Sequence, residues 1–268
     1  AALEKALAEH PEATVVFSTL SETATGVVTD IHGYSAITRN RPQVLVVVGI
    51  SGLGVMPCPM DEWGVDVVVT GSQKALMLPP GLAFIALSEK AWKVVEANYA
   101  SSNPPRTFYF DLRKYRENLK GNDTPFTPAN TLVKALRLSL KRLLEEGLEN
   151  CYRRHARMAA AARAAAQGLR LELLAKTPSN GLTVYKVPAG VDGQAILGVL
   201  EKEHGIRIAG GQDVLKGKIL RLAHMGYIDF FEVLAAVSAL ELALPKFGHA
   251  VTPGEAVSAC QKAYAATA

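Results

Sequence analysis

The sequence predicts an α/β protein with a mostly parallel sheet, followed by a smaller α+β domain. In the first half, short runs of Val, Ile and Leu alternate with helical or loop segments, at residues 13–19, 44–48, 65–70 and 82–87. These runs are continuous rather than alternating with polar residues, which is typical of strands buried on both faces. From about residue 130 the pattern changes to long helices and then to mixed strands and helices.

The change of pattern indicates where the chain divides. Residues 130–169 carry a helical period with a break near Gly147. Amphipathic helices and short strands then follow each other over residues 182–188, 193–205, 218–223 and 229–244. We expect residues 1–146 to form a large domain and residues 147–268 a small C-terminal domain.

Composition limits the kinds of partner. The net charge is +4, and hydrophobic and charged residues make up 49% and 20% of the chain, as in ordinary soluble proteins. The basic run at residues 106–120 reads better as a solvated helix or loop, or the rim of an anion site, than as a nucleic-acid surface. No apolar run approaches the roughly 20 residues of a membrane span. We therefore expect no nucleic-acid partner and no membrane association.

The cysteines and histidines bear on disulfides, on metal binding and on the cellular compartment. Cys58, Cys151 and Cys260 lie far apart and form no C-x-x-C pair, and the histidines show no ligand spacing. This pattern argues against a disulfide framework and against a structural metal site. We expect a cytoplasmic protein without a bound metal.

Three stretches follow the predicted strands of the large sheet. They are "SETATG" at residues 21–26, "GISGLG" at 49–54 and "GSQK" at 71–74. Ligands of parallel α/β sheets bind at the carboxyl ends of the strands, so these stretches are candidates for a site. Lys74, at the exit of a buried strand, is either a surface lysine or an amine whose pKa burial lowers enough for it to form a Schiff base.

Several motifs together resemble one family. "SETATGV", "GLGVMPCPMDEWGVDVVVTGSQK", "ALMLPPGLAFIALSEKAW", "NDTPFTPA", "LEEGLEN" and "GGQDVLKGKILRLAHMG" follow one another in order over nearly the whole chain. They resemble class V aminotransferases, which are fold type I enzymes that use pyridoxal 5′-phosphate (PLP). The resemblance is closest to the alanine–glyoxylate and serine–glyoxylate (serine–pyruvate) branch. It implies the fold type I architecture, with an incomplete large domain here.

The resemblance implies roles for residues at the strand exits. Lys74 would hold PLP covalently and then move the proton of the substrate. Gln73 would lie beside the cofactor, and the hydroxyl of Thr23 would contact its ring. For Thr23, a structural hydroxyl in a strand-to-loop turn is the alternative.

Further roles are implied beyond the predicted large sheet. Arg221 would bind the α-carboxylate of the substrate, which suits the paired donors of a guanidinium; a structural salt bridge is the alternative. Thr127, assisted by Thr124, would reach the PLP phosphate of a neighbouring subunit, so the resemblance implies a homodimer with shared active sites. His224 is expected to pack neutrally, and the "GGQ" stretch at residues 210–212 to form a loop at the substrate entrance.

The chain departs from the family in two respects. Val48 stands where the family carries an aspartate, which pairs with the pyridine nitrogen of the cofactor and keeps it protonated. In addition, family members carry a segment before the position of Ala1, which supplies strands, the phosphate-binding turn and an aromatic side chain against the ring. The opening residues read as the interior of a helix without an N-cap. We therefore expect the chain to be a fragment whose sheet exposes edges and apolar faces.

The function that the resemblance implies is transamination. A small amino acid, alanine or serine, would give its amino group to glyoxylate or pyruvate in two half-reactions. One alternative is another class V PLP enzyme of the lyase type, although neither Cys58 nor Cys260 looks like the mobile reactive cysteine that such enzymes often need. The other alternative is an impaired or non-catalytic homologue, which Val48 favours.

Overall fold

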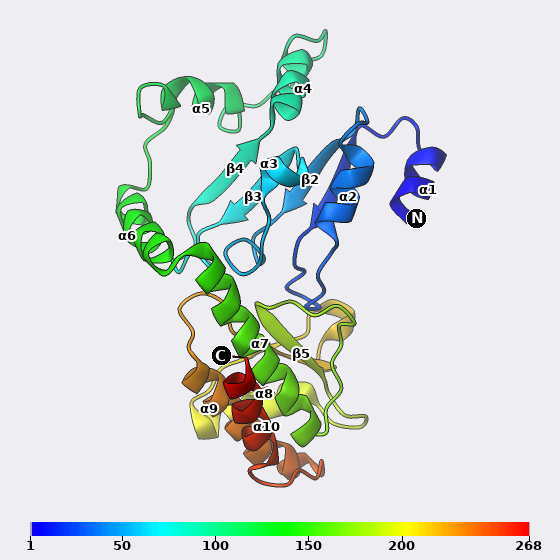
Figure 1. Cartoon of the computed structure of the whole chain (residues 1–268), viewed down its shortest axis with the longest axis vertical. Helices are drawn as coiled ribbons and strands as arrows, with labels where there is room; N and C mark the ends of the chain where they lie inside the picture. Colours follow the sequence, from blue (N-terminus) through cyan, green and yellow to red (C-terminus); the bar gives the residue numbers. More distant parts are fainter. Residues whose placement is uncertain (1, 268) are drawn as a thin grey trace.

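A computed structural model describes residues 2–267, and it contains two sheets joined by two long helices (Figure 1). The first sheet has the order β1-β2-β3-β4. Its strands are β1 (Val15–Thr19), β2 (Val44–Val48), β3 (Val67–Gly71) and β4 (Ala83–Leu87). The first three are parallel and β4 is antiparallel to β3, which confirms a mostly parallel sheet.

Helices cover the two faces of this sheet unequally. The helices of this part are α1 (Ala2–Glu9), α2 (Ile31–Thr38), α3 (Met60–Trp63), α4 (Glu89–Tyr99) and α5 (Leu112–Leu119). The face that packs toward α2 and α3 is a buried core that includes Leu45, Val47 and Val68. On the other face, α4 contributes Ala91 to a small cluster with Val44 and Val67.

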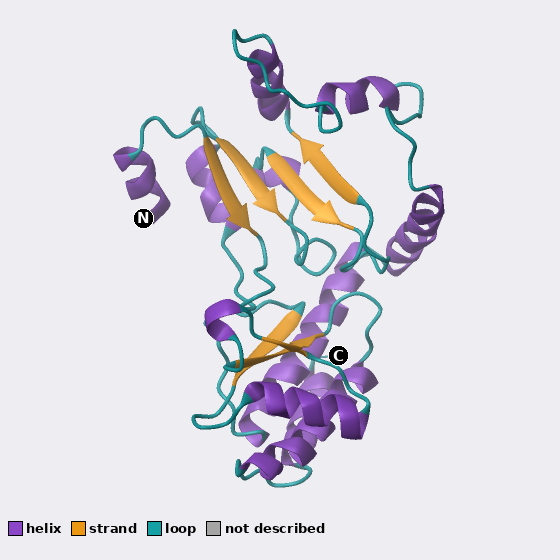
Figure 2. Ribbon diagram, turned by 180° about the vertical axis from the view of Figure 1, so that it is seen from behind, coloured by secondary structure: helices purple, strands orange, loops and turns teal. Residues whose placement is uncertain are grey.

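The prediction that all four strands are buried on both faces is wrong for the two edge strands. Phe17 of β1 is 74% exposed and Ile85 of β4 is 45% exposed. Both belong to the face opposite α2 and α3, which lies toward the viewer in Figure 2. An edge strand has a neighbour on one side only, and no described helix covers this part of the face, so its apolar side chains meet solvent.

The long helical segment is divided as its sequence predicts. Helix α6 (Asn130–Glu146) ends at Gly147, and α7 (Leu148–Gly168) begins directly after it. Gly147 has φ 83°, which a residue with a side chain rarely adopts, so the glycine allows the helix to break there. Dividing the chain into two domains at this glycine remains a prediction.

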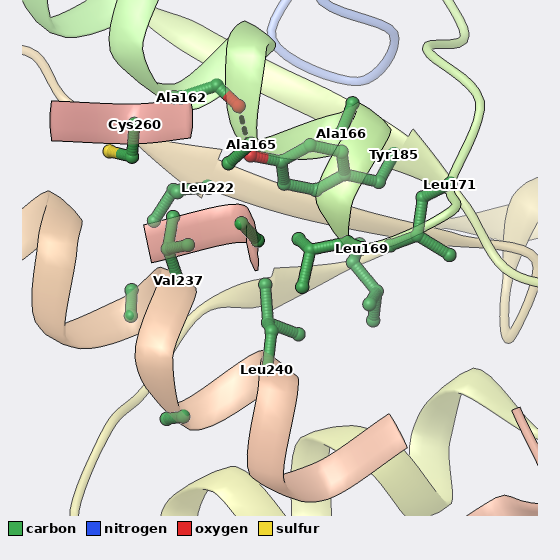
Figure 3. Close-up of a cluster of buried hydrophobic side chains, with 14 of the residues drawn as sticks. Ala162, Ala165, Ala166, Leu169, Leu171, Tyr185, Leu222, Val237, Leu240 and Cys260 are labelled. Carbon is green, nitrogen blue, oxygen red and sulfur yellow. Dashed lines mark hydrogen bonds between the residues drawn. The ribbon is translucent and has the colours of Figure 1, made fainter. Parts of the chain in front are cut away.

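The second sheet is antiparallel and has the order β5-β7-β6. Its strands are β5 (Leu182–Lys186), β6 (Ala209–Gly210) and β7 (Ile219–Ala223). Helices α8 (Gly193–His204), α9 (Phe230–Ala243) and α10 (Glu255–Ala266) pack with α7 around it, and the 3-10 turns η1 (Asp213–Leu215) and η2 (Leu244–Phe247) connect them. The buried core between these elements contains Tyr185, whose hydroxyl donates to Ala162 O at 2.6 Å (Figure 3).

A polar seam joins the two sheets. The loop after β1 runs beside the segment that leads into β5: Ser179 N donates to Gly26 O at 2.8 Å, and Ser21 Oγ donates to Ser179 Oγ at 2.8 Å. Ser21 and Ser179 are buried, where a hydrogen bond between hydroxyls is little disturbed by water. The seam therefore places the carboxyl end of β1 against the second sheet. Among residues 2–267, every helix is too short or too polar to cross a lipid bilayer.

Candidate active site

The two sheets border a cleft of about 550 Å³. It lies where β1 and β3 end and where β7 of the second sheet passes. The lining residues come from five separate stretches of the chain: Glu22, Thr23, Ala24, Gln73, Lys74, Leu182, Ala209, Gln212, Arg221, Ala223 and Met225. Four of the residues that the sequence singled out, Thr23, Gln73, Lys74 and Arg221, are thus brought together.

The turn that carries Lys74 is fixed by Ser72. This serine is fully buried directly after β3; its hydroxyl donates to Pro79 O at 2.7 Å and accepts from Leu82 N at 3.2 Å. Its backbone carbonyl accepts from Leu78 N at 3.1 Å. Because the buried side chain of Ser72 bridges the turn, the backbone around Lys74 is held in place, and Lys74 lines the cleft.

A glycine of the second sheet's following loop packs on this turn. Gly226 has φ 83°, and a Cβ atom placed on it would lie 3.2 Å from Lys74 O. A side chain at this position would therefore be strained and crowded at once. The close approach of Gly226 fixes the small sheet against the lysine turn.

Thr23 and Arg221 meet from opposite sides of the cleft. Arg221 Nε donates to Gly210 O at 2.6 Å and its Nη1 donates to Thr23 O at 2.9 Å. A guanidinium carries five N–H groups, so three N–H groups of Arg221 remain without a partner among residues 2–267. The Thr23 hydroxyl shares a hydrogen bond with the hydroxyl of Ser51, which is buried.

The charges of the cleft favour an anionic ligand. Lys74 and Arg221 are its cations, and Glu22 is the one acidic residue among the described lining. Glu22 is partly satisfied by its own loop, since its Oε1 accepts from Ala24 N at 2.8 Å. Free guanidinium donors beside an amine suit the carboxylate of an amino acid or a 2-oxo acid.

Val48 is the last residue of β2, and it pairs with Thr19 on one side and Val69 on the other. It is half-buried and does not line the cleft. Its neighbours Gly49 and Ile50 are not acidic either, so the end of β2 presents no carboxylate.

The residues present fit PLP in part. The Lys74 amine in the cleft suits the aldehyde of this cofactor, and the hydroxyl of Thr23 supplies a polar partner for its ring. The end of β2, with Val48, offers no acid that could hold a proton on the ring nitrogen. The described cleft thus fits the reactive end of the cofactor and lacks a partner for its nitrogen.

Thr124 and Thr127 lie away from this cleft, in the exposed segment between α5 and α6. The hydroxyl of Thr124 donates to Phe126 O at 2.7 Å, and the Phe126 ring stacks on Tyr109 with a centroid distance of 4.8 Å. The structure does not bring either threonine to the lysine of its own chain. Their role toward a neighbouring subunit remains a prediction.

His224 is buried, and its Nε2 lies 3.0 Å from the hydroxyl of Thr183. Burial lowers the pKa of His224 to about 3, so the ring is neutral at physiological pH, as predicted. The "GGQ" stretch contributes Gln212 to the lining of the cleft, whereas Gly210 forms part of β6.

No cysteine lines the described cleft. Cys260 is buried in α10, and burial raises the pKa of its thiol to about 11. Burial also raises the pKa of the Cys58 thiol. A thiol with a raised pKa is a poor nucleophile, so neither cysteine resembles the reactive group of a desulfurase.

Sequence reasoning missed several residues of the cleft. Ser51 does not line the cleft itself but supports Thr23, which does; this contact joins residues 28 positions apart and depends on the pairing of β1 with β2. Met225 and Ala209 carry no chemical signal in the sequence, and only the folding of the second sheet brings them to the cleft that Lys74 lines.

Comparison with known proteins agrees with this geometry. The family model "Aminotransferase class-V" matches residues 1–229. A relative named "Soluble hydrogenase, small subunit", from Synechococcus sp. (strain PCC 6716), is 42% identical over 250 residues, covering 92% of this chain and 64% of the relative. The serine–glyoxylate aminotransferase of Methylorubrum extorquens is 36% identical over 244 residues, covering 89% of this chain and 61% of the relative.

A solved structure shows the same fold. The pyridoxamine–pyruvate aminotransferase of Mesorhizobium loti superposes with a TM-score of 0.92 at 29% identity, covering 100% of this chain and 69% of that one. The chain spans less than two thirds of the length of the two curated relatives. The match of the family model over most of the sequence, together with these relatives, shows that the chain belongs to the class V aminotransferase family.

Proposed function

We propose that the protein is a PLP-dependent transaminase that moves an amino group from a small amino acid, alanine or serine, to a 2-oxo acid, glyoxylate or pyruvate. The observation that carries the proposal is the meeting of Lys74 and Arg221 in one cleft, with Thr23 between the two sheets. An amine and a guanidinium with free donors are the groups that bind an aldehyde cofactor and a carboxylate substrate.

Lys74 has two tasks in this proposal. Its Nζ binds the cofactor covalently, and, once the substrate has displaced it, Nζ accepts the proton from the substrate Cα and returns it during the transfer. A held backbone and a long side chain at the lining of the cleft suit a group that must reach two neighbouring atoms. PLP, when bound, supplies the electron-withdrawing ring that makes this proton acidic.

Arg221 orients the substrate. Its free N–H groups bind the α-carboxylate, while its bonds to Gly210 O and Thr23 O keep the guanidinium plane fixed. A fixed plane sets the direction of the substrate Cα relative to Lys74 Nζ, and such orientation is a major part of catalysis. Thr23 and Gln73 would position the cofactor from the large-sheet side.

The choice of substrates is supported by the names of relatives. One is a serine–glyoxylate aminotransferase and a structural neighbour uses pyruvate. The amino group would be held on the cofactor between the two substrates, so the reaction would be ping-pong, in two halves.

We also propose a homodimer with shared active sites, in which Thr124 and Thr127 reach the cofactor phosphate of the neighbouring subunit. Their exposure in a segment away from the chain's own cleft supports this assignment. The three free cysteines, Cys58, Cys151 and Cys260, support a reducing cytoplasmic location.

A second candidate is an impaired homologue that keeps the fold and the cofactor site, and Val48 favours it. In this case PLP would bind but amino transfer would be slow. Cofactor binding and transfer rates must therefore be measured separately.

The test is PLP titration followed by absorption spectra, borohydride reduction and peptide mass spectrometry. We expect the cofactor to be fixed to the peptide that contains Lys74, and the Lys74→Ala variant to lose this product. Lys93→Ala, an exposed lysine in α4, is the matched control and should keep it. Folded protein that shows no Lys74-dependent product would refute the proposed function.

A further inference from the structure

A second cavity, separate from the Lys74 cleft, lies between α7 and α10. The two helices run in opposite directions: Gly168 at the end of α7 meets Ala256 at the start of α10, and Arg157 Nη2 donates to Tyr264 O at 3.2 Å near the other end. Figure 1 shows both helices in the lower half of the molecule. The cavity has a volume of about 370 Å³ and is lined by Asn150, Arg153, Arg154, Arg157, Tyr264 and Thr267. Three of these six are arginines and none is acidic.

Two of the arginines lack a negative partner. Arg154 forms an ion pair with Glu146, with Nε 2.7 Å from Oε1. Arg153 donates to the side chain of Asn150, and Arg157 donates to the Tyr264 backbone carbonyl; neither forms an ion pair with any residue of the described chain. Residues 153 and 157 are four apart on one helix, where like charges repel each other. The cavity thus holds two positive charges that nothing in residues 2–267 neutralises.

Arg157 also has an unused donor. Its Nε is buried and has no hydrogen-bond partner among the described residues. Its guanidinium lies over the Tyr264 ring, with Cζ 4.2 Å from the centroid, and Phe230 stacks on Tyr264 at 3.9 Å. The stack fixes the guanidinium in place, so the arginine cannot easily turn its Nε toward water. A buried donor without a partner is uncommon and costs free energy, so the described chain leaves the hydrogen bonding of this guanidinium incomplete.

We propose that this cavity binds a small dianion, either a phosphate or a dicarboxylate. Two unpaired guanidinium groups match two negative charges, and their planar forks bind phosphate and carboxylate oxygens in pairs.

The cavity is connected to the lysine turn through Arg154. Arg154 lines the cavity and its Nη1 donates to Gly226 O at 2.9 Å, while Gly226 packs on Lys74 O. An anion that attracts Arg154 therefore acts on the loop that supports Lys74. An effect of the anion on PLP affinity would rest on the proposed function, but anion binding itself does not.

The test is isothermal titration calorimetry of the PLP-free protein with inorganic phosphate, with succinate and with chloride at matched ionic strength. We expect saturable binding of phosphate or succinate and none of chloride. Arg157→Gln and, separately, Arg153→Gln should each weaken binding by about tenfold, the loss that about 1.4 kcal/mol of charge-assisted hydrogen bonding corresponds to. Arg153 is exposed, so its replacement should leave the fold intact even if Arg157→Gln does not.

Two controls separate this cavity from other basic surfaces. Arg137→Gln removes an exposed arginine of α6 that lies outside both cavities and should bind the anion like the unaltered protein. Arg221→Gln removes the guanidinium of the Lys74 cleft, so it weakens any anion binding in that cleft but should keep the affinity of the binding that depends on Arg153. The proposal is overturned if no dianion binds saturably, if Arg153→Gln binds as well as the unaltered protein, or if Arg221→Gln is the variant that loses binding. The phosphate and succinate arms decide which of the two dianions the site prefers.

Discussion

Lys74 is held in place through its backbone rather than through its side chain. The buried hydroxyl of Ser72 bridges the turn on one side, and the side-chain-free Gly226 packs against the Lys74 carbonyl on the other. Neither contact uses the amine, which is left to the cleft. An enlarged residue at Gly226 would therefore displace the lysine turn without altering any charge.

Replacing Val48 by aspartate is expected to raise the transaminase rate by about two orders of magnitude. The end of β2 lacks a carboxylate, and an ion pair at a buried cofactor contributes a few kcal/mol, or about two decades in rate. Because Val48 is half-buried, the new charge should also lower the free energy of unfolding of the cofactor-free protein by about 1–2 kcal/mol. Single-turnover rates with alanine or serine and urea titrations measure both effects.

Val48→Asn is the control for shape, since asparagine resembles aspartate without its charge. The expected gain belongs to the aspartate variant alone. Equal rates in the two variants would show that charge at this position does not limit the reaction.

At the level of single residues, the sequence predicted which side chains to examine better than it predicted their contacts. Thr23, Gln73, Lys74 and Arg221 were identified by local motifs, and the structure gathers them in one cleft. The bond from Arg221 to Thr23 O joins residues 198 positions apart, a distance that no motif encodes. Such contacts form only when the two sheets pack against each other, and this packing depends on the whole fold.

Helices α9 and α10 are joined by a buried carboxylate. Glu241 of α9 accepts hydrogen bonds from Gly254 N at 2.8 Å, Ala256 N at 2.6 Å and Val257 N at 3.1 Å. These N–H groups lie at the start of α10, which has no side-chain cap of its own. Glu241 therefore serves as the cap from a neighbouring helix, and its charge suits the positive end of the α10 dipole.

Glu241→Gln is expected to lower the free energy of unfolding by about 1–3 kcal/mol, because glutamine keeps one acceptor oxygen and places an NH₂ group against backbone N–H donors. Urea titration monitored by circular dichroism measures the change. Glu255→Gln, an exposed carboxylate in the first turn of the same helix, should change the stability by only a few tenths of a kcal/mol. A loss as large in Glu255→Gln would contradict the capping role of Glu241.

Helix α7 holds the Gly226 loop through a neutral histidine. His155 Nδ1 donates to Cys151 O at 2.7 Å, and its Nε2 accepts from Gly226 N at 3.1 Å. Burial lowers the pKa of His155 to about 4, with Arg154 adding to the effect. An acceptor nitrogen at Nε2 is incompatible with protonation, so the loop depends on the neutral ring.

Stability is therefore expected to fall on acidification. Between about pH 6.5 and 4 the unfolded chain binds a proton at residue 155 and the folded chain does not, so the contribution of His155 is complete above pH 6.5 and declines below it. From pH 7 to pH 5 this decline is about 2 kcal/mol. Urea titrations at both pH values should show a smaller decline in His155→Gln than in the unaltered protein. His10→Gln, an exposed histidine, should keep the full decline.

Helices and strands with a long sequence pattern were predicted well. Strand direction and short strands were predicted poorly, because they depend on the neighbouring strand. The break at Gly147 and the helices α8 and α9 follow from periodicity and glycine in the sequence. The antiparallel direction of β4 does not, because a run of apolar residues reads the same in either direction. Strand β6 is only two residues long and exists because β7 pairs with it.

On the scale of the whole molecule, the cleft depends on how firmly the two sheets are held together. The seam of Ser21, Ser179 and Gly26, the bond from Arg221 to Thr23 O, and the contact of Gly226 with Lys74 all cross between them. The sequence predicted two units of different class but could not predict this seam, because hydroxyls and glycines are common in any loop. The site is therefore a property of the packed pair of sheets.

One face of the first sheet stays open in this arrangement. Val15 and Phe17 of β1 and Ile85 of β4 lie on it and are 36%, 74% and 45% exposed. Parallel sheets are normally covered on both faces, and an uncovered apolar face attracts other hydrophobic surfaces.

We expect this open face to dominate self-association of the protein. The double variant Phe17→Thr/Ile85→Thr keeps β-forming residues in both strands while it removes the apolar surface, so it should bind several-fold less of the dye 8-anilinonaphthalene-1-sulfonate and aggregate more slowly. Leu242→Thr, which removes an equally exposed leucine from α9, controls for hydrophobicity elsewhere and should change neither signal much. If the leucine variant lowers dye binding as much as the double variant does, the open face is not the main surface for self-association. If the double variant alone lowers it, the open face of β1 and β4 is the main surface for self-association.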